Sequence, residues 1–168
     1  MQEYVTDAIV LNRDENGELD ARFSFFSKLY GKLKPKGKSI RKITSKLSGH
    51  LDVGNLVTVR LVEKRGLQVV DALKKSSLPI SPPDLHMLNQ LLGEGEADLP
   101  LWNALVQRPF RWVHILALLG WDPLEAQCAA CGAMRPAHFA IHSQEFFCEA
   151  CCSASRTPQN ELVYVVYE

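Results

Sequence analysis

The stretch Tyr4-Val-Thr-Asp-Ala-Ile-Val-Leu11 decides how the first part of this chain folds. Its residues are mostly apolar and β-branched with partial alternation, a pattern that favours a β-strand. Asn16-Gly17, a strong signal for a two-residue turn, follows a few residues later. We therefore predict a hairpin whose return strand runs from Ala21 to Phe26.

Three further strands are expected after this hairpin. They lie at Lys32–Lys36, where Pro35 favours an edge or a bulge, at Leu56–Val62 and at Leu67–Leu73. Residues 39–51 between them carry mixed signals and fit a loop or a short helix. Five short strands with one long connection fit a small OB-type barrel. Another five-stranded barrel, such as an SH3-like one, fits the periodicity nearly as well.

Prolines mark the end of the predicted barrel. Leu78-Pro79 and Ser81-Pro82-Pro83-Asp84 cannot continue a strand ladder. We therefore divide the chain into an OB-fold nucleic-acid-binding domain, residues 1–78, and a helical domain with a metal module, residues 79–168. The predicted class is α+β.

Three helices are expected in the second domain. Asp84 is predicted to cap the first, a second runs through Trp102 to Val106, and a third spans Phe110 to Gly120, where the glycine ends it. The alternating segment Leu162–Tyr167 is typical of a strand.

Two cysteine pairs indicate a metal site. The pairs are Cys128-Ala-Ala-Cys131 and Cys148-Glu-Ala-Cys151, with 16 residues between them. This spacing is typical of a four-cysteine zinc ribbon. Four thiolates fill a tetrahedron and leave no position for catalysis, so we predict one structural Zn²⁺. Cys152 is expected to be a spare thiol, and His138 and His142 to serve packing or to face solvent. Disulfides, a redox dithiol or plain core cysteines are the alternatives.

Charge is distributed unevenly along the chain. Residues 1–78 hold 15 Lys and Arg against 9 Asp and Glu, a net charge of +6, and the remainder holds 4 against 10, a net charge of −6. One half therefore suits a polyanion and the other does not. Four thiolates on one divalent ion would add a formal charge of −2 to the acidic half. This argues against the zinc ribbon as the main nucleic-acid-binding surface.

The basic half contains a stretch without acids, Ala21–Leu51, which is unusual for a surface that serves only solubility. We predict that its cations bind nucleic-acid phosphates and that the binding weakens as salt rises. Lys32, Lys34 and Lys36 alternate, so in a strand they share one face. The nine predicted contacts are Arg22, Lys28, Lys32, Lys34, Lys36, Lys38, Arg41, Lys42 and Lys46.

Aromatic residues in the same stretch have two interpretations. Phe23, Phe25, Phe26 and Tyr30 could stack on bases, as on OB folds that bind single strands. For the three phenylalanines we favour the barrel core. Adjacent Phe25 and Phe26 must point to opposite faces of a strand, so at least one of them is expected to be buried.

Several classes of protein fit less well. The most apolar segment, Val113–Leu119, is far shorter than the ~20 residues of a membrane helix, and no leader pattern is visible at the N-terminus, so we expect a cytoplasmic protein. The acids of the first hairpin form no obvious metal-binding pair, so we expect no enzyme. A nuclease, or an RNA-binding or ribosome-associated zinc-ribbon protein, remains an alternative.

These features together resemble one known family. The first half resembles the N-terminal barrel of RecO, the recombination mediator, in the order and spacing of six segments. These are Thr6–Leu11, Gly31-Lys-Leu, Lys36-Gly-Lys, Ser45-Lys-Leu-Ser-Gly-His-Leu51, Leu56-Val-Thr-Val and Arg65-Gly-Leu. Phe110–Trp121 followed by Cys128–Gly132 resembles the entry to the zinc module of its zinc-bearing members. The chain thus looks like a shortened, zinc-bearing RecO.

The resemblance carries expectations that the residues alone do not. It implies a role in DNA repair and recombination, with binding of single- and double-stranded DNA, annealing of complementary strands and assistance in loading RecA. It also implies RecR and the single-stranded-DNA-binding protein as partners, RecA as an indirect one, and a nucleoid-associated location.

Overall fold

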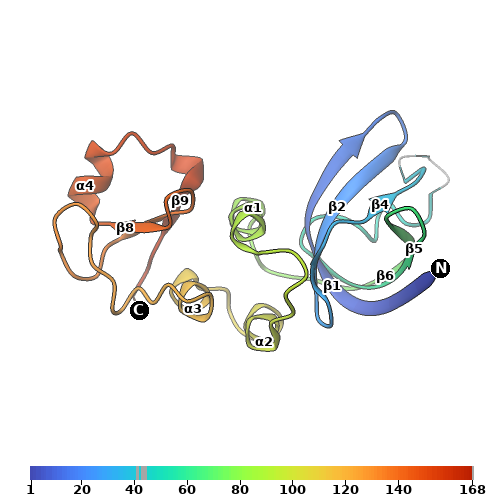
Figure 1. The fold of residues 1–168 in the computed structure, drawn as a ribbon, viewed down its shortest axis with the longest axis horizontal. Coiled ribbons are helices and arrows are strands. Elements are labelled where there is room, and N and C mark those ends of the chain that lie inside the picture. Colours follow the sequence, from blue (N-terminus) through green and yellow to red (C-terminus); the bar gives the residue numbers. More distant parts are fainter. Residues whose placement is uncertain (41, 43–44, 168) are drawn as a thin grey trace. The chain divides into compact units, whose positions relative to one another are not determined.

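The computed structural model describes residues 1–40, 42 and 45–167, apart from the side chain of residue 16. The described chain forms two compact units, Met1–Leu99 and Pro100–Glu168 (Figure 1). The domain boundary predicted after Leu78 follows the last barrel strand, whereas the first unit also includes the next helix. Whether residues 1–78 form a domain of their own stays a prediction.

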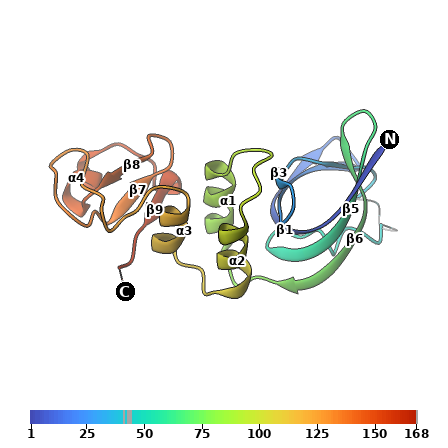
Figure 2. The same cartoon turned by 60° about the horizontal axis from the view of Figure 1, so that its bottom comes forward.

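The first unit is built on a closed barrel. Its order, β1-β5-β6-β4-β2-β3, closes because β1 also pairs with β2, and the strands curl around one axis (Figure 2). β3 and β4 are two pieces of the predicted third strand, so the five-stranded OB-type barrel and the α+β class are confirmed. The strands are β1 (Gln2–Asn16), β2 (Asp20–Ser27), β3 (Gly31–Leu33), β4 (Lys36–Gly37), β5 (Asn55–Glu63) and β6 (Leu67–Ser77).

The first hairpin is longer than predicted. β1 and β2 stay paired as far as Asn16 and Asp20, so the connecting turn is the three residues Gly17–Leu19 rather than a two-residue turn. Gly17 has φ 74°, a conformation that glycine adopts without strain. The turn signal was therefore correctly placed, but its length was wrong.

Pro35 breaks the predicted third strand in two. Proline lacks the N–H that a ladder needs, so β3 ends at Leu33 and β4 begins at Lys36. The Phe23 N–H still donates to the Pro35 carbonyl at 3.0 Å, which holds the break against β2. The chain therefore crosses this part of the barrel as two short strands instead of one.

The long connection between β4 and β5 closes the barrel core. Its Ile40 and Leu51 are buried with Phe25 and Val59 of the strands. The Asn55 side chain fixes the connection by donating to the carbonyls of residues 49 and 50, at 3.4 and 3.0 Å. In its described part the connection consists of turns rather than a helix.

Helix α1 (Pro82–Leu91) begins earlier than predicted. Its N-cap is Ser81, whose hydroxyl accepts from the Asp84 N–H at 3.2 Å, so the prediction of Asp84 as the cap was wrong. Pro82 and Pro83 fit because the first turn of a helix leaves its N–H groups unbonded anyway. α1 buries Leu85 and Leu88 and contacts β1.

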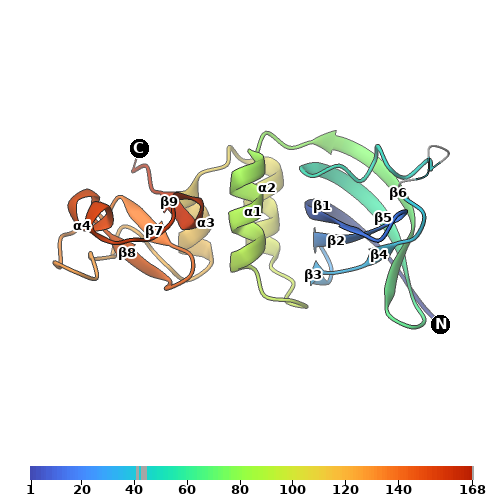
Figure 3. The same cartoon turned by 90° about the horizontal axis from the view of Figure 1, so that it is seen from above.

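The second unit combines helices with a small sheet. The strands form the order β8-β7-β9, so the predicted C-terminal strand is present and pairs with β7 (Figure 3). No helix among the described residues is long and apolar enough to cross a bilayer. The elements are α2 (Leu99–Gln107), α3 (Trp112–Leu118), β7 (His138–Ala140), β8 (Glu145–Phe147), α4 (Glu149–Ala154), a 3₁₀ turn (Gln159–Glu161) and β9 (Leu162–Tyr164).

Candidate nucleic-acid interface and metal centre

A basic pocket of about 580 Å³ lies in the first unit. Arg22 and Lys36 are cross-strand partners on β2 and β4, and Lys32 and Lys34 join them from the neighbouring β3 segment. Four of the nine predicted cations therefore line one pocket. Its other lining residues are Asn12, Asp14, Phe23, Ser24, Asn89 and Gln90.

Lys32 has a structural role within this pocket. Its ammonium donates to the Asn89 and Leu92 carbonyls, and the residue is only 7% exposed. Burial lowers the pKa of the Lys32 ammonium, and the nearby Lys34 charge lowers it further. Lys32 thus joins β3 to the C-terminal end of α1, where free carbonyls favour a cation. Lys32 is therefore not one of the exposed cations of the pocket.

Lys34 is paired with an acid at the rim. Its ammonium contacts the Glu94 carboxylate, and this hydrogen bond lowers the pKa of Glu94. Both side chains are more than half exposed, so water screens the pair strongly. Arg22 and Lys36 are exposed and have no ion pair among the described residues, which leaves them as the cations most available to a phosphate.

The other predicted cations lie outside this pocket. Lys38, Lys42 and Lys46 are exposed on the connection that closes the barrel, and Arg41 lies outside the described residues. Lys28 follows the opposite end of β2 from Arg22. The pocket thus accounts for four of the nine predicted cations, and a single groove that includes the others stays a prediction.

A second basic position was missed by sequence reasoning. Lys75 of β6 forms a 2.8 Å ion pair with Asp7, whose carbonyl accepts from the Lys28 N–H at 2.9 Å. Two lysines distant in sequence thus lie beside the same acid. The adjacent pair Lys74-Lys75 was the available signal, but it falls outside the acid-free stretch.

The aromatic residues serve mainly the core. Phe23, Phe25 and Phe26 are at most 2% exposed, and the rings of Phe23 and Phe25 stack with centroids 5.5 Å apart. The preference for core packing over base stacking was therefore correct. Tyr30 is partly exposed and packs edge-on against Tyr4, with ring centroids 5.2 Å apart.

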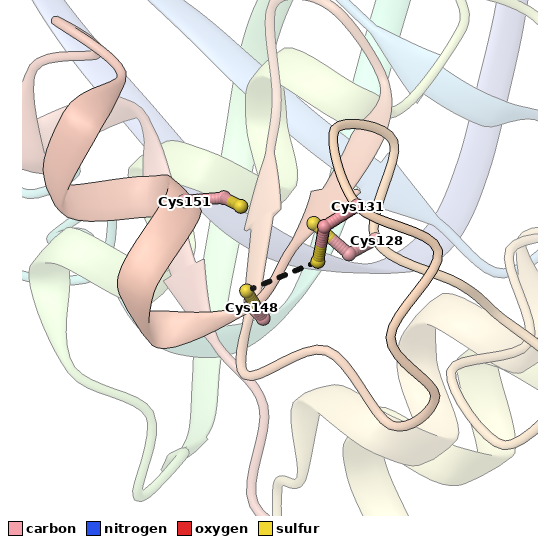
Figure 4. A group of neighbouring side chains, drawn as sticks. All are labelled: Cys128, Cys131, Cys148 and Cys151. Carbon is pink, nitrogen blue, oxygen red and sulfur yellow. Dashed lines mark hydrogen bonds between the residues drawn. The ribbon is translucent and has the colours of Figure 1, made fainter.

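The second unit brings the four predicted cysteines together. The sulfur atoms of Cys128, Cys131, Cys148 and Cys151 all lie within 4.8 Å of one another (Figure 4). Those of Cys131 and Cys148 are 3.7 Å apart. A tetrahedral ion with Zn–S bonds of ~2.3 Å requires sulfur separations of about 3.8 Å. The donor set and its spacing therefore fit one tetrahedral divalent ion.

Local backbone geometry positions both cysteine pairs. The Gly132 N–H donates to the Cys128 carbonyl at 2.8 Å, and Gly132 has φ 75°, as expected for the tight turn after Cys131. Cys148 caps α4, which places Cys151 one turn further along the same helix. The β7–β8 hairpin connects the two pairs.

The cluster is also suited to a cation electrostatically. The backbone N–H of Cys148, followed by those of Cys131 and Ala130, lowers the pKa of Cys128 to about 6 despite its burial. The neighbouring thiols of Cys148 and Cys131 raise the pKa of Cys151 to about 12. One thiolate thus forms readily, while further negative charge needs a positive ion to offset it.

The nearby candidates stay outside the cluster. Cys152 is buried, and burial raises the pKa of its thiol. His138 Nε2 lies 3.1 Å from a carboxylate oxygen of Glu149, and His142 is exposed. These positions agree with a spare thiol and with histidines that pack or face solvent.

Comparison with known proteins identifies the family. A family model described as "Recombination protein O N terminal" matches residues 1–77, which is the barrel. A protein named DNA repair protein RecO from Cutibacterium acnes is 39% identical over 169 residues, covering 81% of this chain and 68% of that protein. Another of the same name from Bifidobacterium longum is 25% identical over 184 residues, covering 89% and 74%.

The Cutibacterium match extends well beyond the barrel, because it includes four fifths of the chain. The closed barrel and the cysteine cluster are present in the same order that the sequence resemblance required. The chain therefore belongs to the RecO family and has a function in DNA repair and recombination.

Proposed function

We propose that this protein is a non-enzymatic recombination mediator that binds single- and double-stranded DNA, anneals complementary strands and assists the loading of RecA. The observation that carries the proposal is the convergence of Arg22, Lys34 and Lys36 on one pocket of a RecO-family barrel.

Neutralised phosphates supply the mechanism. Arg22 and Lys36 present exposed cations from adjacent strands, and Lys38 extends the charge onto the connection. Cations that replace counterions on DNA lower the repulsion between two strands, so complementary bases can meet. This role needs positioned charge and no reacting group.

The metal module is proposed to be structural. Cys128, Cys131, Cys148 and Cys151 would hold one Zn²⁺, which supplies charge neutralisation and cross-linking of the two turns. With four thiolates the site keeps a negative charge, so it repels phosphates. We therefore assign DNA binding to the barrel.

A matched pair of charge-reversal variants tests the DNA surface. Arg22→Glu combined with Lys36→Glu should weaken DNA binding by at least tenfold and reduce the slope of log affinity against log salt by about 2. Lys64→Glu combined with Arg65→Glu makes the same charge change at the exposed β5–β6 turn and should have a much smaller effect. Equal affinities for the two double variants in a mobility-shift titration would contradict the assigned surface.

Two alternatives have direct tests. A nuclease would need carboxylates that hold a metal ion. Among the described residues, the group of side chains close enough to hold one is made of cysteines, and the Asp7 carboxylate accepts hydrogen bonds from Lys75 and Thr58. Labelled DNA incubated with magnesium should therefore stay intact, and cleavage would favour a nuclease. Competition between DNA and RNA of the same sequence separates the proposal from an RNA-binding zinc-ribbon protein.

The partners are proposed from the family. We expect RecR, the single-stranded-DNA-binding protein and, indirectly, RecA, in a cytoplasmic and nucleoid-associated setting. Annealing of complementary strands, measured with and without the single-stranded-DNA-binding protein, tests function and partner together. Failure to anneal bare strands would contradict the mediator function, and failure only on coated strands would contradict the partner.

We propose that one pocket of the second unit contacts the single-stranded-DNA-binding protein. It has a volume of about 250 Å³ and combines apolar Ile115 and Leu118 with the basic side chains of Arg108, Arg111 and His114. Arg108→Glu should reduce annealing of coated strands without affecting bare strands. An equal loss on both would remove this pocket from the proposal.

A further inference from the structure

We propose that a second pocket of the first unit stacks one unpaired base of single-stranded DNA on the ring of Tyr30. The inference rests on the proposed DNA binding and specifies how a single strand is held. It adds to the phosphate contacts of the basic pocket a separate site, the tyrosine pocket, where a base contacts the protein.

The tyrosine pocket has walls that suit a flat, largely apolar ligand. It has a volume of about 390 Å³, and its lining includes Tyr4, Tyr30 and three leucines, Leu29, Leu33 and Leu67. Leu29 is 57% exposed and the other four residues are partly exposed, so solvent, and therefore a ligand, reaches them. The volume falls in the ~300–1,000 Å³ range of sites that enclose small organic ligands, so one base fits.

The turn that carries Tyr30 is held in one conformation. The buried Ser27 hydroxyl accepts from the Tyr30 N–H at 3.0 Å and donates to the Gly31 carbonyl at 2.8 Å. Gly31 has φ 68°, and a Cβ atom there would lie 2.2 Å from the Glu96 backbone, so only glycine fits between the two segments. A turn formed in advance loses little conformational freedom when a ligand binds.

Tyr30 has at least one ring face that Tyr4 does not cover. The two rings pack edge-on, at 78° to each other and with centroids 5.2 Å apart. In such a pair one ring turns its edge, and the other a single face, toward its neighbour. The Tyr4 hydroxyl donates to a Glu63 carboxylate oxygen at 2.8 Å, which helps to hold the ring against which Tyr30 packs. Tyr30 therefore offers a supported flat surface to a base.

Charged side chains beside the pocket favour a nucleotide over the apolar side chain of a protein. Exposed Lys28 directly precedes Leu29 of the pocket. Exposed Lys34 directly follows Leu33, at the other end of the same segment. Phosphates flank every base of a strand, and grooves that hold single strands combine such cations with aromatic rings. Glu63 also lines the pocket, and its carboxylate repels phosphates, so we expect the base rather than the backbone to enter.

Stacking determines which DNA this site should prefer. A base can enter the pocket only after it leaves its own stack, which is least costly in single strands. Every base has a flat face, so stacking on a ring tolerates all four bases. The pocket therefore predicts a preference for single strands that carry bases over abasic strands, with little preference among sequences.

An abasic strand separates base contacts from phosphate contacts. The full chain is titrated by fluorescence anisotropy with oligo-dT and with an abasic strand of equal length. We expect oligo-dT to bind roughly tenfold more tightly, which is the effect of stacking one base. Tyr30→Leu keeps apolar bulk but removes the flat ring, so it should reduce the affinity for oligo-dT to about that for the abasic strand. The slope of log affinity against log salt should not change, because no charge is lost.

Matched variants control for effects on folding. Tyr30→Phe keeps the ring and should keep the preference for oligo-dT. Tyr164→Leu makes the leucine change at a tyrosine of β9 that is 60% exposed and lies outside the pocket, and it should also keep the preference. If Tyr30→Leu melts at a lower temperature, Leu29→Ala repeats the test at an exposed residue of the pocket and should likewise reduce the preference.

The outcomes separate the base site from DNA binding itself. Equal binding of both strands by the unmodified chain would overturn the base site, as would a preference that survives both Tyr30→Leu and Leu29→Ala. A loss in Tyr30→Leu confined to the annealing of strands coated with the single-stranded-DNA-binding protein would overturn it in favour of a protein side chain. DNA binding through phosphates would stand in each of these cases, whereas a chain that binds neither strand overturns both proposals.

Discussion

The barrel and the cysteine ribbon are stabilised in different ways. The barrel encloses a continuous apolar core with Phe23, Phe25 and Val59 at its centre. The ribbon has strands of only three residues each, with Phe139 and Val163 buried at its small sheet, and it brings four sulfur atoms together. A small module of this kind can fold only when something else supplies the missing free energy. We therefore expect the first unit to fold without a metal and the ribbon to need one.

Metal removal should produce the largest difference between the two units. Structural zinc contributes on the order of 10 kcal/mol or more to the folding of such modules, so chelation should unfold the ribbon and leave the barrel folded. All three tryptophans, Trp102, Trp112 and Trp121, lie in the second unit, and the Trp121 ring packs 5.3 Å from that of Phe139. Tryptophan emission should therefore shift to the red while strand circular dichroism changes little.

The cysteines provide a matched control for this experiment. Cys148→Ser should reproduce the effect of the chelator, and Cys152→Ser, at a buried cysteine outside the cluster, should keep the metal. Less than about half an equivalent of zinc in the purified protein would count against the site.

A cavity in the barrel core should have the opposite effect, because it should destabilise the first unit and leave the ribbon unchanged. Phe25 is fully buried in the barrel core, so Phe25→Ala should destabilise the first unit by about 3–5 kcal/mol. Chemical denaturation followed by tyrosine fluorescence and circular dichroism measures this loss, and the zinc content should stay unchanged. Leu73→Ala, at a residue that is 63% exposed, is the control. A similar loss for both variants would contradict the core described here.

The link between β3 and α1 should contribute less. Lys32→Met removes the donor to the Asn89 and Leu92 carbonyls and should cost about 1–3 kcal/mol. Faster hydrogen exchange in α1 would localise the effect to that helix. Lys36→Met, at an exposed lysine of the same basic stretch, should change stability by less than about 0.5 kcal/mol. If the two variants lost equal stability, Lys32 would have no special structural role.

Protonation of Asp7 in acid should lower stability the least of the four changes considered. Partial burial raises the pKa of Asp7, but hydrogen bonds from Lys75 and Thr58 outweigh it and hold the pKa below its ordinary value of 3.8. Because the folded pKa is lowered, this stabilisation is present above pH 3.8 and is lost as the pH falls below it. The partly exposed Lys75 limits the contribution to less than about 1 kcal/mol.

Unfolding of the first unit by denaturant at pH 7 and pH 3 measures this contribution. Asp7→Asn should lose stability at pH 7 and show a weaker dependence on pH than the unmodified chain. Glu18→Gln in the exposed hairpin turn is the control, and an equal response to pH in both variants would contradict the role of Asp7.

Several features could be predicted because they depend on local sequence. The hairpin around Gly17, helices α2 and α3, and the two cysteine turns follow from alternation, turn residues and cysteine spacing, whereas α4 was not predicted. Helix and strand ends were less predictable, since Ser81 and Asp84 offer nearly the same cap signal. Pro35 was recognised as a weak point, but the sequence could not show whether it would bulge or break the strand.

By itself, the sequence determined the barrel-and-ribbon plan, the four clustered cysteines and the basic character of the first unit, because periodicity, spacing and charge are properties of neighbouring residues. Only the tertiary structure decided which cations face outward. Lys32 and Lys36 look equivalent along the chain, yet one is buried against α1 and the other is exposed. The difference arises because α1, some 50 residues later, brings carbonyl groups to Lys32 alone, and contacts between distant segments leave no mark in a local pattern.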